Sequence, residues 1–171
     1  MKYFLFLFLF IVSGSYANFI DVANYSKEAQ KRAFFINKKK EEFKSLPKLS
    51  QLEEVNAFFN KSIKYKSDLD LWNKKDYKAS LKETIEKGML GDCEEYVLAK
   101  SEALIYLGFD LSEARVVIST ENGIAHMKLF VKVDGTIYVL DNLNKEFKAA
   151  TMQENVDRMY SVNSLIKIVR S

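Results

Sequence analysis

The sequence predicts an α+β fold, in which helices come first along the chain and antiparallel strands follow. Before Gly108, apolar residues recur at steps of three and four, which is the spacing of one helix face. After Gly108 the pattern becomes alternating, which is typical of strands with one buried face. Asp134-Gly135 stands between two apolar runs and indicates a tight hairpin turn. A chain of 171 residues suits one domain.

Residues 1–17 are predicted to be a secretory signal peptide. Met1-Lys2 gives a short positive start, residues 3–12 are apolar, and small residues precede a cut after Ala17. The alternative is a membrane anchor, but the apolar run is about half of the roughly 20 residues that a span needs. We therefore expect residues 18–171 to form one exported domain without a membrane span.

Charge and the use of cysteine and histidine limit the function. The formal net charge of +3 falls by one when Lys2 is removed, and this is too small to indicate a nucleic-acid partner. The local lysines of residues 31–40 are expected to form a solvated helix face. With Cys93 and His126 each the only residue of its type, a zinc site built from several Cys or His ligands is excluded. A single cysteine in an exported chain is either buried or a reactive thiol.

The first three predicted helices are defined by composition and capping patterns. Residues 26–46 are polar and lysine-rich, and they predict a surface helix that ends near Pro47. The segments 50–53 (Ser-Gln-Leu-Glu) and 80–83 (Ser-Leu-Lys-Glu) each match a capping box, so a helix is expected to begin at each. The helix after residue 50 has one apolar face, formed by Leu52, Val55, Phe59 and Ile63.

The fourth predicted helix places Cys93 in its first turn. Asp92 is a good N-cap residue, and Gly108 just beyond the last apolar residue is a usual helix stop. The free amides and the macrodipole at a helix start favour a thiolate, whereas a cysteine inside the core is inert. The acids Asp92, Glu94 and Glu95 oppose a thiolate. Either they cap the helix and complement its dipole, or a hard cation such as Ca²⁺ compensates them.

The sheet is expected to contain strands at residues 114–120, 125–133, 136–140 and 165–170. With Asp134-Gly135 as the two loop residues, Lys128 lies opposite Asp141. His126 then projects from the same face as Asp141, as a diagonal neighbour roughly 7–8 Å away between backbones. A one-residue bulge would change this register. Alone, His126 and Asp141 each have an ordinary structural explanation, but together with a thiol they fit a nucleophile, its base and the group that orients the base.

Several blocks carry a family resemblance. The run 91–96 (Gly-Asp-Cys-Glu-Glu-Tyr) resembles the nucleophile block of the bacterial transglutaminase-like cysteine proteinases of the LapG type. Further blocks that are similar to the family's pattern are 55–60, 71–72, 76–77, Val97-Leu98-Ala99-Lys100, Ala125-His126-Met127 and Leu140-Asp141-Asn142-Leu143. The resemblance covers roughly residues 50–145. It implies a papain/transglutaminase-like α+β fold and a triad of Cys93, His126 and Asp141.

The resemblance also implies an activity and a setting. It implies a periplasmic, calcium-dependent cysteine endopeptidase, with Asp92 and Glu94 as the calcium residues. Substrates of the family are large surface adhesins, cut near the amino terminus at a paired-alanine site, and this cleavage controls biofilm attachment. An inner-membrane receptor for a cyclic dinucleotide sequesters the family's proteases.

Two departures from the family's pattern and two other functions stay open. Glu95 replaces a common aspartate, and Lys78-Ala79-Ser80 replaces a run that usually contains tryptophan and proline. A transglutaminase-like amidase or acyl transferase would use the same thioester chemistry with water or an amine as acceptor. A catalytically silent periplasmic binding module would keep the fold and bind a partner without cleaving it.

Overall fold

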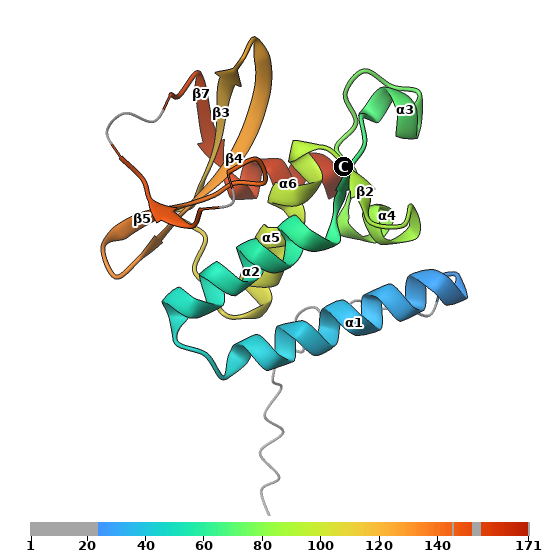
Figure 1. Ribbon diagram of the computed structural model, residues 1–171, viewed down its shortest axis with the longest axis horizontal. Coiled ribbons are helices and arrows are strands. Elements are labelled where there is room, and N and C mark those ends of the chain that lie inside the picture. The colour runs from blue at the N-terminus through green and yellow to red at the C-terminus, as the bar shows by residue number, and fades with distance from the viewer. Residues whose placement is uncertain (1–23, 145, 152–154, 171) are drawn as a thin grey trace, which may run out of the picture.

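The structure, a computed structural model, describes residues 24–144, 146–151 and 155–170. The predicted signal peptide at residues 1–17 lies outside this range. Among the residues that are described, no helix combines the length and the apolar character that crossing a bilayer requires. A helical layer packs against an antiparallel sheet, so the predicted α+β arrangement is confirmed (Figure 1).

Most of the helices come before the strands of the large sheet in the sequence. Figure 1 shows α2 and α5 between the sheet and α1, in agreement with the contacts of α1 with α2, of α2 with α5, and of α5 with β4. A short parallel pair, β1 with β2, ties the end of α2 to the segment before α5. The helices are α1 (Lys27–Lys44), α2 (Lys48–Ser62), α3 (Asp68–Trp72), α4 (Leu81–Glu86), α5 (Cys93–Tyr106) and α6 (Val162–Arg170).

The sheet has five antiparallel strands in the order β6-β5-β4-β3-β7. Its strands are β3 (Arg115–Glu121), β4 (Ile124–Val133), β5 (Thr136–Leu140), β6 (Lys148–Ala149) and β7 (Arg158–Ser161), while β1 (Lys64–Tyr65) and β2 (Leu90–Gly91) form the separate pair. Asp134 and Gly135 both have positive φ, at 49° and 81°, as a type I′ hairpin turn requires. Val133 pairs with Thr136 and Leu129 with Leu140, so the predicted register of this hairpin is confirmed.

The core lies between α5 and the inner face of the sheet. The predicted apolar face of α2 is confirmed, because Leu52, Val55 and Phe59 are fully buried. On α5, Leu98 and Leu104 are buried in the same cluster as Leu129 of β4. A smaller cluster, formed by Val117, Phe130 and Val139, covers the opposite face of the sheet. The apolar residues of β4 therefore face the helices at odd positions, which places the even positions His126 and Lys128 on the other face.

The predicted start of one helix is wrong. The helix expected from a capping box at Ser50 begins earlier, because α2 starts at Lys48 directly after Pro47. The ring of a proline fixes its φ and removes its N–H. The N-cap position does not have to donate a helical hydrogen bond, so Pro47 can occupy it and α2 can begin at the next residue.

The second capping box is confirmed, since Ser80 accepts the Glu83 amide and the Glu83 carboxylate accepts the Ser80 amide.

The strand predicted at residues 165–170 is also wrong. This segment belongs to α6, which begins directly after the short strand β7. The Ser161 hydroxyl accepts the amide of Ser164 at 3.2 Å and so caps the first turn. Apolar residues at helical spacing then turn towards the core: Val162, Leu165, Ile166 and Val169.

One buried charge in α5 stands out from the apolar core. Lys100 has 0% exposure, although lysine is rarely buried without a partner. Its burial lowers the pKa of Lys100 to about 7, and the negative charge of Asp141 acts in the opposite direction. Because this pKa is depressed below its value in the unfolded chain, protonation of Lys100 favours unfolding.

This burial predicts a particular pH dependence of stability. We expect the wild-type free energy of unfolding, relative to that of Lys100→Met, to fall as the pH decreases from about 10 to about 7, and to level off below that. Each pKa unit is worth about 1.4 kcal/mol, so the change should reach a few kcal/mol. Denaturant unfolding at several pH values measures it, with the exposed Lys38→Met as control. Parallel pH profiles for wild type and Lys100→Met would contradict the burial of a charge at this position.

Candidate active site

The start of α5 is fixed by a reciprocal cap. The Asp92 side chain accepts the amide of Glu94, while the Glu95 carboxylate reaches back to the amide of Asp92 at 2.8 Å. Gly91 is required by this fold-back, because a Cβ at that position would lie 2.6 Å from the Glu95 side chain. The prediction of Asp92 as N-cap and Cys93 in the first turn is therefore confirmed.

Glu95 also binds the loop before α4 to the start of α5. Its other carboxylate oxygen accepts the amide of Ala79 at 2.9 Å, and its exposure is only 1%. The same carboxylate thus holds both the start of α5 and the loop that leads into α4. Burial is the main cause that raises the pKa of Glu95 to about 7, and the two amide hydrogen bonds oppose it.

The Cys93 thiol lies near Met127 of β4. Pairing between β4 and β5 stops at Leu129, and beyond that point the backbone amide of Met127 acts to lower the pKa of the Cys93 thiol. Met127 is the residue after His126, so the helix start approaches the strand where the histidine stands. The thiol also donates to the Glu94 carboxylate at 3.2 Å. Burial, followed by the negative charge of Glu94, raises the pKa of Cys93 strongly, so the thiol is held protonated in this arrangement.

His126 and Asp141 meet as the hairpin register predicts. His126 Nε2 lies 2.8 Å from Asp141 Oδ1, and both side chains are buried. The amide of Leu143 donates to the same oxygen at 2.8 Å, and Asn60 Nδ2 on α2 donates to the Asp141 carbonyl at 2.6 Å. Burial alone would raise the pKa of Asp141, but the hydrogen bond from His126 and the Leu143 amide hold it below its ordinary value. An ionised Asp141 accepts the proton on Nε2, which leaves Nδ1 as the basic nitrogen of the ring.

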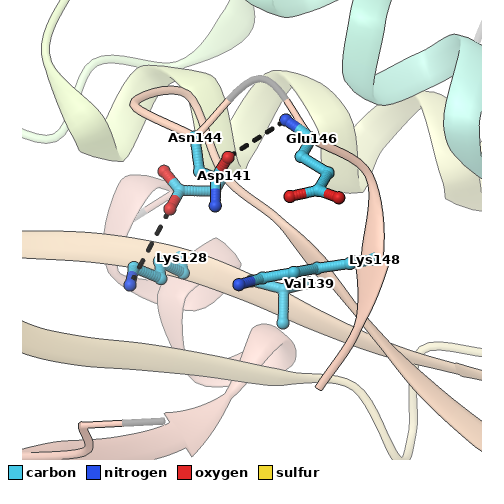
Figure 2. A pocket seen from close by; sticks show the side chains of 6 residues that line it. All are labelled: Lys128, Val139, Asp141, Asn144, Glu146 and Lys148. Atoms are coloured by element: carbon cyan, nitrogen blue, oxygen red, sulfur yellow. Dashed lines mark hydrogen bonds and ion pairs between the residues drawn. The ribbon is translucent and has the colours of Figure 1, made fainter. Parts of the chain in front are cut away.

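Lys128 supplies positive charge beside this pair. Its ammonium forms an ion pair with Glu121 and lies 3.7 Å from Asp141 Oδ2 (Figure 2). Figure 2 also shows a pocket beside Asp141, lined by Lys128, Val139, Asn144, Glu146 and Lys148. The second oxygen of Asp141 therefore faces a cation while the first faces the histidine, which orients the carboxylate.

Acidic groups crowd the other side of the thiol. Ligand oxygens of Asp92 and Glu94 lie within 4.8 Å of each other and of the Cys93 sulfur. Burial, with the charge of Glu94 beside it, raises the pKa of Asp92 to about 9, and hydrogen bonds from Asp92 and Cys93 lower that of Glu94. Lys78 lies 3.7 Å from Glu94 but is itself paired with Asp76 at 2.7 Å. Two half-buried carboxylates whose oxygens lie this close together suit a hard divalent cation.

Some residues of this site were not singled out from the sequence. The Asp92-to-Glu95 spacing is itself a capping-box pattern, and it was the available signal for the fold-back of Glu95. Asn60 of α2 and Asp68 of α3 also reach the site; Asn60 lies in the block 55–60 of the family resemblance, whereas no local pattern marks Asp68. Of the three residues of the predicted triad, the structure pairs His126 with Asp141, and it places Cys93 at the start of α5, grouped with Asp92 and Glu94.

Solved structures of a Legionella pneumophila protein, LapG, share this fold. Legionella pneumophila LapG has a TM-score of 0.67 to this chain at 23% identity, and the match covers 85% of this chain and 91% of that chain. Its calcium-bound form gives 0.67 at 24% identity over 84% and 92%, and its EGTA-treated form gives 0.67 at 24% over 85% and 91%. Comparison with curated proteins gives no match.

The family is shown by the sequence itself. The family model for the bacterial transglutaminase-like cysteine proteinases matches residues 15–160, which span most of the chain and include the helix start, the hairpin and the cap described above. The transglutaminase-like fold of the solved structures agrees with this match. The chain therefore belongs to the bacterial transglutaminase-like cysteine proteinase family.

Proposed function

We propose that this chain is a periplasmic, calcium-dependent cysteine endopeptidase, with Cys93 as nucleophile, His126 as base and Asp141 as the group that orients the base. The observation that carries this proposal is the 2.8 Å contact between His126 Nε2 and Asp141 Oδ1, in a chain whose only cysteine stands at the start of α5. A buried histidine hydrogen-bonded to a carboxylate keeps one tautomer, and its second nitrogen is then free to take a proton. The membership of a cysteine proteinase family supports the same chemistry.

The proposed reaction follows the thioester route. His126 removes the proton from the Cys93 thiol, and the sulfur attacks the carbonyl carbon of the scissile peptide. The C–N bond breaks as the leaving amine takes the proton from His126, which leaves a thioester on Cys93. A water molecule, deprotonated by His126, then attacks the thioester, and the thiol is regenerated with release of the carboxylate product. Asp141 stabilises the imidazolium in both halves of the reaction.

Asp92 and Glu94 are the proposed calcium ligands. Their carboxylates are partly buried next to Cys93 and have no lysine or arginine in direct contact among the described residues except Lys78 at 3.7 Å from Glu94. When bound, a divalent cation supplies the positive charge that makes a neighbouring thiolate less costly. Capture of the Glu94 carboxylate would also remove the acceptor that holds the thiol proton. A calcium-bound LapG among the solved structures supports this choice of metal.

The substrate and setting are proposed from the family resemblance. We place the mature protein, residues 18–171, in the periplasm, where it cleaves a large surface adhesin near its amino terminus at a paired-alanine site. This cleavage would release the adhesin and control biofilm attachment. An inner-membrane receptor for a cyclic dinucleotide is the proposed partner that sequesters the protease. The match to LapG structures supports the choice of this branch of the family.

The first test of this proposal is cleavage of an adhesin amino-terminal fragment by the mature chain in the presence of calcium. We expect a single cut by the wild type and no cut by Cys93→Ala, which removes the nucleophile. Asp141→Asn should reduce kcat by about 10⁴, since it favours the wrong histidine tautomer. Asp134→Asn, at the exposed hairpin turn where asparagine tolerates a positive φ of 49°, is the matched control and should cleave normally.

The outcomes of this test separate the three functions. Cleavage that persists in Cys93→Ala would overturn the proposed nucleophile. Products that carry an added lysine or another amine would indicate an acyl transferase, because the acceptor would then be an amine and not water. A folded wild type that binds the fragment but never cuts it would indicate a binding module.

The calcium proposal has a separate test. A chelator in excess should abolish cleavage and lower the thermal unfolding midpoint of the wild type, because the ion binds only the folded arrangement of Asp92 and Glu94. Asp92→Asn and Glu94→Gln should each lose the calcium-induced rise in the midpoint. Glu86→Gln, an exposed acid at the end of α4, is the control and should keep it. Full cleavage in excess chelator would contradict the calcium proposal, and we would then assign both acids a role as helix caps.

A further inference from the structure

Asp68 is a buried acid that no local structure explains in full. It lies in the first turn of α3 and is only 4% exposed. One of its oxygens, Oδ2, accepts the amide of Tyr77 at 2.6 Å and so closes the loop that follows α3. The other oxygen, Oδ1, is buried and has no hydrogen-bond partner. A buried carboxylate oxygen without a partner is unfavourable, so this atom needs a ligand.

The Asp68 carboxylate lies beside the start of α5. A carboxylate oxygen of Asp68 lies within 4.8 Å of those of Asp92 and Glu95, although α3 and α5 are separate elements. Both oxygens of Glu95 are already used by the amides of Asp92 and Ala79. Asp92 therefore stands between two acidic groups, with Glu94 on one side and Asp68 on the other.

A purely structural role does not account for the second oxygen. One acceptor is enough for the Tyr77 amide, and an asparagine would supply it without a charge. A carboxylate instead places a negative charge beside Asp92 and Glu95, where like charges repel. The neighbouring acid on the same helix behaves differently, because Asp70 is exposed and paired with Lys66 at 3.1 Å.

We propose that Asp68 is a further ligand of the divalent cation at Asp92, so that the ion joins α3 to the N-terminus of α5. This inference rests on the proposed calcium site and extends it to a third carboxylate from a different part of the chain. Oxygen ligands from several elements are the usual surroundings of Ca²⁺. The segment between Asp68 and Ala79 also carries Lys78, which faces Glu94. Calcium would therefore fix one wall of the region around Cys93 as well as its charge.

The test compares two isosteric substitutions on one helix. Asp68→Asn keeps an oxygen for the Tyr77 amide and removes the charge, while Asp70→Asn removes a charge that faces solvent. Calcium titration of the mature chain, followed by calorimetry and by thermal unfolding, gives the affinity and the calcium-induced shift of the midpoint. We expect Asp70→Asn to bind as the wild type does. We expect Asp68→Asn to bind at least about tenfold more weakly, with a calcium-free midpoint equal to or above that of the wild type.

The possible failures can be told apart. A wild type that does not bind calcium would overturn the proposed calcium site itself. A wild type that binds calcium, together with an Asp68→Asn variant that binds equally well, would overturn only the role of Asp68. If Asp68→Asn does not fold, hydrogen exchange of the wild type decides the matter: calcium should protect the amides of residues 68–78, and protection confined to the start of α5 would overturn the inference.

Discussion

The buried carboxylate of Glu95 is the interaction on which the site depends. One oxygen accepts the amide of Asp92 and so begins α5, while the other accepts the amide of Ala79 and holds the preceding loop against it. Gly91 has to lack a side chain for this fold-back to occur. Because the helix begins where Glu95 fixes it, Cys93 lies at the start of α5, near Met127 of β4. The fold thus positions Cys93, the proposed nucleophile, through a helix cap, and His126, the proposed base, through a hairpin register.

The negative charges around Cys93 oppose the formation of a thiolate. A helix start normally favours a thiolate, but here Asp92 and Glu94 surround the sulfur and act in the opposite direction. The nearby Lys78 is shared with Asp76, so it compensates only part of this charge. The charges around Cys93 therefore disfavour the thiolate that the proposed chemistry needs. In the proposed calcium-bound state, a cation held by these acids would offset the negative charge beside the sulfur.

The parts of the fold that follow from local pattern were predictable. The hairpin turn at Asp134-Gly135 sets a register in which His126 and Asp141 are neighbours, and this follows from period-two alternation alone. The helix start at Cys93 follows from the capping preference of Asp92. The fold class followed from the same patterns together with the family resemblance over roughly residues 50–145.

Other features depend on tertiary contacts or on competing local signals. Residues 165–170 are apolar enough for a strand or a helix, and the Ser161 cap after β7 decides for the helix. The helix α2 begins at Lys48, directly after Pro47, and not at the capping pattern of Ser50. The approach of Asn60 and Asp68 to the site arises from the packing of α2 and α3, which no spacing along the chain encodes.

Alkylation of the single cysteine tests the link between charge and chemistry most directly. Because Cys93 is the chain's only thiol, its rate of reaction with iodoacetamide across pH reports that residue alone. If cation binding at Asp92 and Glu94 releases the thiolate, calcium should lower the apparent pKa of alkylation and raise the rate at neutral pH at least about tenfold over the rate in EGTA. Superimposable pH profiles with calcium and with EGTA, in a protein shown to bind calcium, would contradict it.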